Sequence, residues 1–464
     1  MKYLSARAHE LLSRNVLLPA ARLKRAVRPS SRAVIHAYYD GMKFRRQAES
    51  WNRAEKSQYL LQRLRFVVRR AYAETDYYRE LFDRIGFDTR SEFGFDEFAL
   101  IPVLEREDIR TAGRALISNR MSMGQLQKDA TGGSTGSPTE LWLGPEERGW
   151  KESSGEYFMR RMGVPSGART GLLWGHNLDP HAPTSLRERL YALQTNSRYF
   201  DCLRLSRDTL DQYHSQFESW RPTTIIAYAS ALGHLAEHIL ERRLRPNYPS
   251  GCFVTGAEKL LPAHREMIET AFGRPVHERY GSRDAGYIAF QIKPNCSHEY
   301  EVDWANILVE PEAEDQESDI LVTKLHADGM PMLRYRIGDV GRFPDGSKPG
   351  HPAFVLDEVI GRDVDRISLP DGRWITGLQI PHLIKDYPVR EYMFIQRSDY
   401  SIEIRIAPTT RFTDEAGAKI LDIVRANLPG LKVSLQLVSQ IPRTAANKWR
   451  PVVSEVRIVK DNVA

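Results

Sequence analysis

The chain has 464 residues, 41% of them hydrophobic and 27% charged, and its net charge at pH 7 is +6. These values are ordinary for a soluble globular protein with a large core, and the length predicts roughly two to four domains. Three widely spaced cysteines argue against a disulfide scaffold, and the mild positive charge suits anionic small substrates. We expect a cytoplasmic protein that binds no nucleic acid, because no recognition module, signal peptide or transmembrane run is visible.

Residues 1–100 are predicted to form a mostly helical region that is very basic at its start. Leucines alternate there with Arg7, Arg14 and Arg22. The favoured interpretation is a helix that packs on its own domain and leaves a basic face in solvent. The alternative is an amphipathic segment that lies on an anionic membrane surface.

Helix and strand patterns alternate along the middle of the chain. Helices are predicted at residues 146–162, 206–220, 232–243 and 263–272, and strands at 170–174, 224–228 and 251–255. Residues 276–360 are richer in strands, which we predict at 307–310, 320–325, 332–336 and 354–360. This order predicts a layered α/β core with a largely parallel sheet over residues 101–360.

A domain boundary is predicted at Gly361 and Arg362, where an apolar strand stops and a charged segment follows. Beyond it, strands are predicted at residues 391–396, 401–406 and 432–438, with a helix at 413–428. Residues 361–464 are therefore predicted to form a small α+β domain.

A glycine loop precedes the α/β core. Its backbone N–H groups and hydroxyls can line a concave site for an anion, and a nucleotide triphosphate is the obvious ligand. The loop is not a Walker A motif, which needs a lysine after its last glycine. For the loop alone, a flexible linker is the alternative. Its residues are Thr131, Gly132, Gly133, Ser134, Thr135 and Gly136, followed by Ser137 and Pro138.

Four further polar stretches follow predicted strands. Any one of them can be a plain turn, because a glycine next to an acidic residue after a strand is a common turn signature. Their joint order after a glycine loop indicates a functional site. The stretches are Gly256–Glu258, Tyr280–Asp284, Tyr335–Asp339 and Pro442–Lys448.

In this order, the segments resemble the adenylate-forming superfamily of acyl-CoA synthetases. They are most similar to its phenylacetate–coenzyme A ligase-like branch, which includes the CapK-like capsule-polysaccharide proteins. The resemblance covers residues 51–455. It implies a large adenylation domain with layered α/β sheets and a helical N-terminal region, followed by a small mobile α+β domain that carries Lys448. It also implies ATP, Mg²⁺ and coenzyme A as cofactors.

The resemblance assigns roles to the polar stretches. The glycine loop would hold the β- and γ-phosphates of ATP. A second group would line the AMP pocket, stack on adenine, and contact the α-phosphate and the ribose. This group comprises Gly256, Ala257, Glu258, Tyr280, Gly281, Ser282, Arg283 and Asp339.

Catalysis would depend on three residues. Asp284, which stands where the family usually has glutamate, would bind Mg²⁺ through its carboxylate. Arg362 would lie at the hinge and reach the nucleotide. Lys448 would bridge the substrate carboxylate and the α-phosphate. The acyl pocket is assigned to Trp174, His176, Tyr228 and Ala229.

The sequence departs from the family pattern at several positions. Ser137 and Thr139 leave the glycine loop without the lysine often found there, and Arg283 replaces the usual threonine. Val364 stands where the hinge usually carries a charge, and Asn447 replaces the glycine before Lys448. A non-catalytic relative is therefore an alternative. Elsewhere, Cys296 and His298 fall short of the four ligands of a structural zinc site.

The reaction implied by the resemblance is the activation of a carboxylic acid by ATP. It yields acyl-AMP and pyrophosphate, and a thiol, most often that of coenzyme A, then takes the acyl group. One alternative is transfer to a carrier protein, an amine or a polysaccharide sugar. The other is an ATP-binding scaffold at a polysaccharide assembly complex, docked through the basic N-terminal segment. Each of these functions is compatible with an oligomer.

Overall fold

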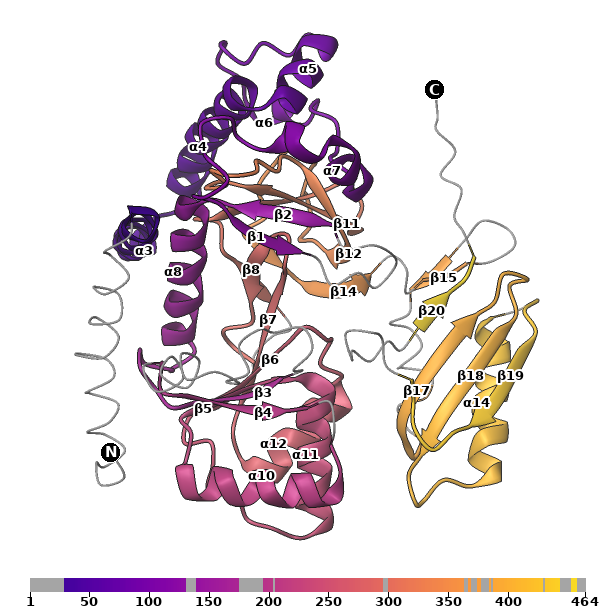
Figure 1. Cartoon of the computed structure of the whole chain (residues 1–464). Helices are drawn as coiled ribbons and strands as arrows, with labels where there is room; N and C mark the ends of the chain where they lie inside the picture. The colour runs from indigo at the N-terminus through magenta and orange to yellow at the C-terminus, as the bar shows by residue number, and fades with distance from the viewer. Residues whose placement is uncertain are drawn as a thin grey trace. The chain divides into compact units, whose positions relative to one another are not determined.

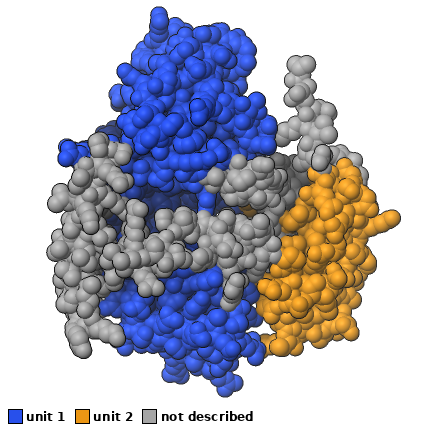
Figure 2. All heavy atoms as spheres, in the orientation of Figure 1, with its two compact units in different colours: residues 1–337, 341–359 blue, residues 338–340, 360–464 orange. Residues whose placement is uncertain are grey.

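The computed structural model describes the chain in segments that form two compact units (Figure 1). One unit comprises residues 1–337 and 341–359, and the other comprises residues 338–340 and 360–464 (Figure 2). The described residues are 29–130, 139–174, 195–202, 205–294, 299–362, 366–368, 374–376, 384, 387–428, 430–442 and 452–456.

Helices dominate the N-terminal part of the first unit. Local sequence sets their ends: Asn52 and Glu55 form a capping box at the start of α4, and the left-handed Gly86 ends α5. The elements are α3 (Pro29–Gln47), η2 (Ala48–Ser50), α4 (Arg53–Glu74), α5 (Asp76–Ile85), α6 (Phe95–Phe98), α7 (Arg106–Ala112) and η3 (Gly113–Leu116). In the described part of the chain, no helix is long and apolar enough to span a membrane.

An eight-stranded sheet runs through the first unit in the order β13-β9-β8-β7-β6-β5-β3-β4. Neighbours from β7 to β4 pair in parallel, and those from β7 to β13 pair antiparallel. The strands are β3 (Thr170–Trp174), β4 (Ser197–Asp201), β5 (Thr224–Tyr228), β6 (Cys252–Gly256), β7 (Val276–Ser282), β8 (Gly286–Phe290), β9 (Tyr300–Val302) and β13 (Val355–Leu356).

Both faces of the parallel half of this sheet are covered, which explains why β5 and β6 are continuous apolar runs. Ile225 and Phe253 pack into a core with helices α10 (Arg207–Trp220), α11 (Ala229–Glu241) and α12 (Pro262–Phe272). Ile226 and Val254 face the other way, where α8 (Pro145–Arg161) contributes Phe158. The predicted alternation of strands and helices is confirmed.

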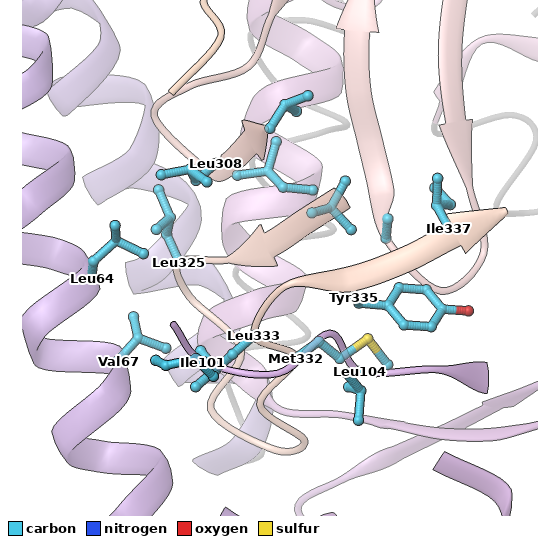
Figure 3. Packing of buried hydrophobic residues seen from close by; sticks show 14 of the residues in the cluster. Leu64, Val67, Ile101, Leu104, Leu308, Leu325, Met332, Leu333, Tyr335 and Ile337 are labelled. Carbon is cyan, nitrogen blue, oxygen red and sulfur yellow. The ribbon is translucent and has the colours of Figure 1, made fainter. Parts of the chain in front are cut away.

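A second sheet lies closer to the N-terminal helices. Its order is β10-β11-β12-β14, and its strands are β10 (Ile307–Pro311), β11 (Glu317–Lys324), β12 (Tyr335–Arg342) and β14 (Glu358–Arg362). Figure 3 shows Leu64 and Val67 of α4 packed near Leu325 and Leu333. The hairpin of β1 (Gln127–Ala130) and β2 (Glu140–Leu143) flanks the residues of the glycine loop in sequence.

The strand predicted at residues 332–336 is wrong at its start. The backbone of Arg334 takes a φ of 49°, which interrupts the extended chain, so β12 begins only at Tyr335. The guanidinium of Arg334 is buried and pairs with Glu310 over 3.2 Å. The turn that it forms lets the segment after Pro102 run beside the start of β12, with Leu104 and Tyr335 in a parallel bridge.

Helix α3 packs closely on α8 because small residues line the contact. A side chain at Gly149 would collide with the carbonyl oxygen of Val34, so only glycine fits there. At the C-terminal end of α3, the buried Arg45 forms a two-pronged ion pair with Asp303 over 3.0 and 2.8 Å. Burial makes such a pair costly to break, because the remaining charge would lack a partner.

Asp328 caps the N-terminus of α8 from a distant part of the chain. Its carboxylate accepts hydrogen bonds from the backbone N–H groups of Glu146 (2.9 Å) and Glu147 (3.2 Å). Burial raises the pKa of Asp328 to about 6, although the two N–H donors act in the opposite direction. The position of α8, which follows the glycine loop and β2 in sequence, thus depends on this carboxylate.

The second unit is a small α+β structure. Its main sheet has the order β19-β18-β17-β20. The elements are β15 (Arg366–Ser368), β16 (Trp374–Thr376), β17 (Val389–Gln396), β18 (Ile402–Pro408), α14 (Asp414–Asn427), β19 (Val433–Leu437) and β20 (Val452–Ser454). The predicted fold class, a layered α/β core followed by a small α+β structure, is confirmed.

Candidate functional site

The carboxyl ends of the parallel strands bring together residues that are far apart in sequence. Trp174 ends β3, Tyr228 ends β5, Gly256 ends β6 and Ser282 ends β7. In open α/β sheets, ligands bind in the crevice outside these strand ends. The predicted acyl and nucleotide residues among them therefore share one edge of the sheet.

Aromatic rings form one part of this edge. The ring centroids of Trp174 and Tyr228 lie 4.3 Å apart in an edge-on arrangement. The guanidinium carbon of Arg279 lies 5.2 Å from the centre of the Trp174 ring and 5.7 Å from that of Tyr287. Such distances are typical of a cation stacked on aromatic faces.

The segment after β6 has a strained backbone. Ala257 takes a φ of 67°, a left-handed conformation that costs a non-glycine residue roughly 1–2 kcal/mol. Glu258, next to it, accepts a hydrogen bond of 2.9 Å from the backbone N–H of Ser230 at the start of α11. This bond holds the predicted AMP loop against the turn that carries Tyr228 and Ala229.

A tight turn joins β7 to β8 and positions Asp284. A side chain at Gly281 would collide with the carbonyl oxygen of Gly286, so the two strands approach closely only with glycine there. Within the turn, the Ser282 hydroxyl donates to Asp284 and accepts from the backbone N–H of Ala285. Contacts among residues 281–286 thus stabilise the turn that positions Asp284.

The Asp284 carboxylate, 2% exposed, also connects two distant elements. Its Oδ2 accepts from the hydroxyl of Tyr335 on β12 (2.7 Å) and from Nη2 of Arg106 on α7 (3.2 Å). Burial by itself raises the pKa of Asp284, but the hydrogen bonds from Ser282 and Tyr335 and the charge of Arg106 outweigh it, so the pKa is lowered. The carboxylate is therefore ionised at neutral pH.

These contacts decide how Asp284 can bind Mg²⁺. Oδ2 accepts from both Tyr335 and Arg106, and Oδ1 accepts from Ser282. In the described segments no group of three or more acidic, His or Cys side chains could hold a metal. Mg²⁺ in nucleotide sites is commonly held through one or two carboxylates together with substrate phosphates. Asp284 supplies one such carboxylate, and Oδ1 is its oxygen with fewer side-chain donors.

A search of family models finds no match. The chain is 21% identical to protein CapK of Staphylococcus aureus, over 77% of this chain and 80% of that protein. It is 22% identical to phenylacetate–coenzyme A ligase of Thermus thermophilus, over 84% of this chain and 95% of the ligase. The chain is homologous to these two proteins. The resemblance predicted from the motifs is confirmed.

The fold agrees with this relationship. A crystal structure of 2-hydroxyisobutyryl-CoA ligase in the postadenylation state, with an acyl-AMP bound, matches with a TM-score of 0.70 at 17% identity. The match covers 88% of this chain and 91% of the ligase. The same ligase has been solved with 2-HIB-AMP and CoA. The chain therefore has the fold of adenylate-forming ligases.

Several predicted site residues lie outside the described residues. They are Thr131–Gly136 with Ser137, His176, Val364, Asn447 and Lys448, and also the zinc candidates Cys296 and His298. Asp339 is half-buried in β12, and Arg362 ends β14, where its side chain is not among those described. Their roles stay predictions.

Two residues, Arg106 and Arg279, were not singled out in the sequence, and Tyr335 was singled out only as the start of the polar stretch Tyr335–Asp339. Arg106 and Tyr335 contact Asp284 from 178 and 51 residues away, and no spacing rule reveals such pairs. Arg279 could have been predicted near the site, because it directly precedes Tyr280 near the end of β7. Its neighbour Glu278 points to the opposite face and pairs with Arg265 over 2.8 Å.

A cavity of about 680 Å³ lies at the other side of the first unit, beside β9 and β13. Trp304, Phe354 and Lys56 are among its lining residues, and Lys56 lies 5.3 Å from the Trp304 ring. None of the predicted site residues that the structure describes lines it. The cavity is therefore separate from the sheet edge described above.

Proposed function

We propose that the protein activates a carboxylic acid with ATP and transfers the acyl group to a thiol, with coenzyme A as the acceptor. The observation that carries this proposal is the meeting of Trp174, Tyr228, Gly256 and the Asp284 turn at one sheet edge. It occurs in a fold shared with a ligase solved with acyl-AMP. Homology to phenylacetate–coenzyme A ligase supports the same reaction.

In the first half-reaction, a carboxylate oxygen of the acid attacks the α-phosphorus of ATP, and the bond to pyrophosphate breaks. Negative charge concentrates around the phosphorus, so fixed donors and cations lower the barrier and no protein nucleophile is needed. Tyr280 would stack on adenine, and Asp339 would accept hydrogen bonds from the ribose. Mg²⁺ bound through Asp284 would neutralise part of the phosphate charge.

Lys448 would act in this half-reaction only, as the cation between the substrate carboxylate and the α-phosphate, with the glycine loop on the pyrophosphate side. In the second half, the thiol sulfur attacks the acyl carbon and AMP leaves. We propose that the small unit, with Arg362 at the hinge, moves Lys448 away before this step. We further propose a cytoplasmic location, where ATP and coenzyme A are both available.

The decisive assay is acid-dependent exchange of labelled pyrophosphate into ATP. Lys448→Ala should abolish exchange while leaving thioester formation from supplied acyl-AMP. The matched control is Lys419→Ala, which removes a surface lysine paired with Glu415 on α14 and should behave as the wild type. Normal exchange by Lys448→Ala would refute the role of Lys448. Nucleotide binding without exchange, over a broad acid panel, would instead favour the scaffold.

The acceptor is tested separately. With coenzyme A present, the expected product is an acyl-CoA, and its formation should stop when coenzyme A is omitted. Release of AMP that is independent of coenzyme A but requires a carrier protein, an amine or a sugar would identify the alternative acceptor. The basic N-terminal segment is tested by removing residues 1–28 and measuring binding to anionic vesicles.

A further inference from the structure

Arg279 has an unusual position at the sheet edge. Its half-buried side chain lies on the same face of the sheet as Tyr287, whose ring packs against Gly155 of α8. Gly256 makes room for it, because a side chain at that position would come within 3.0 Å of the Arg279 side chain. Arg279 therefore stands between the predicted AMP loop and the predicted acyl-pocket residue Trp174.

Three other arginines of this region pair with acids. Arg265 pairs with Glu278 over 2.8 Å, Arg106 with Asp284 over 3.2 Å, and Arg283 with Asp129 over 3.8 Å. Arg279, in contrast, contacts aromatic rings, and no carboxylate within the described part of the chain forms an ion pair with it. A half-buried guanidinium without a counter-ion is unfavourable, so an anionic ligand would gain free energy by binding there.

The surroundings favour recognition of a planar or tetrahedral oxyanion. The rings of Trp174 and Tyr287 limit the rotamers of Arg279, and a guanidinium whose orientation is fixed can donate two parallel hydrogen bonds to one oxyanion. A second cation, Lys151 of α8, runs its aliphatic stem past Gly286, next to Tyr287. Lys151 therefore adds a second positive charge near Tyr287.

We propose that Arg279 binds a second anionic group of the acid, so that the substrate is a carboxylic acid with a further carboxylate or phosphate. The inference rests on the proposed function, because it takes Trp174 and Tyr228 as walls of the acyl pocket. The reacting carboxylate would point to the nucleotide and the second oxyanion to Arg279. An acid without that group would leave the guanidinium unpaired, which is how a polar pocket rejects an analogue.

The test compares acids with and without a second oxyanion on similar carbon frameworks: benzoate, terephthalate and 4-phosphonobenzoate, together with butyrate, succinate and 3-phosphonopropionate. Binding of each acid alone is measured by calorimetry, and pyrophosphate release is measured with ATP. The proteins are the wild type, Arg279→Leu, Arg279→Lys and the control Arg198→Leu. Arg198 also stacks on an aromatic ring, that of Trp220 at 4.6 Å, but it lies near the start of β4.

The wild type should bind at least one acid with a second oxyanion ten times more tightly than the counterpart that lacks it. Arg279→Leu should remove this preference, chiefly by weakening the binding of the acids that carry the second group. Arg279→Lys should keep part of the preference, and Arg198→Leu should keep all of it. The two arms of the panel decide whether the second group is a carboxylate or a phosphonate, the stable analogue of a phosphate.

Three results would overturn the inference. The first is a wild type that shows no preference for acids with a second oxyanion, or that binds none of them. The second is a loss in Arg279→Leu that is equal for all acids and extends to ATP, which would place the nucleotide phosphates at Arg279. The third is a lower unfolding midpoint with unchanged preference. Binding through Arg279 without pyrophosphate release would refute the proposed function alone.

Discussion

Replacing Tyr335 with phenylalanine removes a single hydroxyl from the bond network around Asp284. That hydroxyl is buried, with Tyr335 1% and Asp284 2% exposed, and the bond is 2.7 Å long. A buried hydrogen bond to a charged group contributes about 1.5–3 kcal/mol, and no other described donor takes its place. We therefore expect the free energy of unfolding of the first unit to fall by about 2 kcal/mol.

Tyr335→Phe should also change how stability depends on pH. The pKa of Asp284 is lowered in the folded protein, so its contribution to stability is full above the ordinary value of 3.8 and is lost as the pH falls through the folded value. Without the Tyr335 hydroxyl, burial opposes ionisation with fewer compensating bonds, so the pKa rises. The variant should lose stability at a higher pH than the wild type during acid titration.

Urea unfolding followed by tryptophan fluorescence measures both effects, since the chain has 8 tryptophans. The matched control is Tyr72→Phe, which removes a tyrosine–aspartate bond of 3.0 Å to Asp83 at the surface and should leave the midpoint unchanged. A loss below about 0.5 kcal/mol in Tyr335→Phe, or an equal loss in the control, would refute the reasoning about buried charge-assisted bonds.

Three further predictions concern the stability of the first unit. Arg45→Met and Asp303→Asn should each lower the free energy of unfolding by about 3–5 kcal/mol, and the double variant should lower it by much less than the sum of the two. Losses that add up in urea unfolding would contradict a coupled pair. Because the folded pKa of Asp328, about 6, exceeds its ordinary value, its contribution is full below about pH 4 and is lost as the pH rises through 6. The free energy of unfolding of Asp328→Asn should therefore rise relative to that of the wild type between pH 4 and pH 7. A difference between the two proteins that does not change with pH would count against this. Gly149→Ala should lower stability by about 1–3 kcal/mol, because the new methyl group collides with Val34; an unchanged thermal midpoint would show that α3 moves aside freely.

The regular part of the fold was readable from the sequence, since hydrophobic patterns and helix caps are local. The strands at 170–174 and 224–228 were predicted with the observed bounds. Strand β20 was not predicted, because three residues, Val452–Ser454, become a strand only by pairing with β17. The start of β12 was misplaced because the left-handed backbone of Arg334 leaves no mark in its residue type.

The candidate site was predicted as a set of motifs, and its internal contacts were not. Glu258 was expected in the AMP pocket, and its carboxylate also caps α11 at Ser230. Arg106, Asp284 and Tyr335 meet across 229 residues of chain, a contact that depends on how the two sheets are placed in the first unit. Motif order thus predicts where the candidate site lies, while the packing of distant elements decides which charges are paired.

The ion pair between Arg45 and Asp303 also sets an order of events during synthesis. The two residues are 258 positions apart, so at about 5–20 residues per second the ribosome needs about 13 to 50 seconds to reach Asp303 after Arg45. The small-residue face of α8 is complete much earlier. Arg45 therefore lacks its partner throughout that interval, and the buried ion pair can form only after β9 has been synthesised.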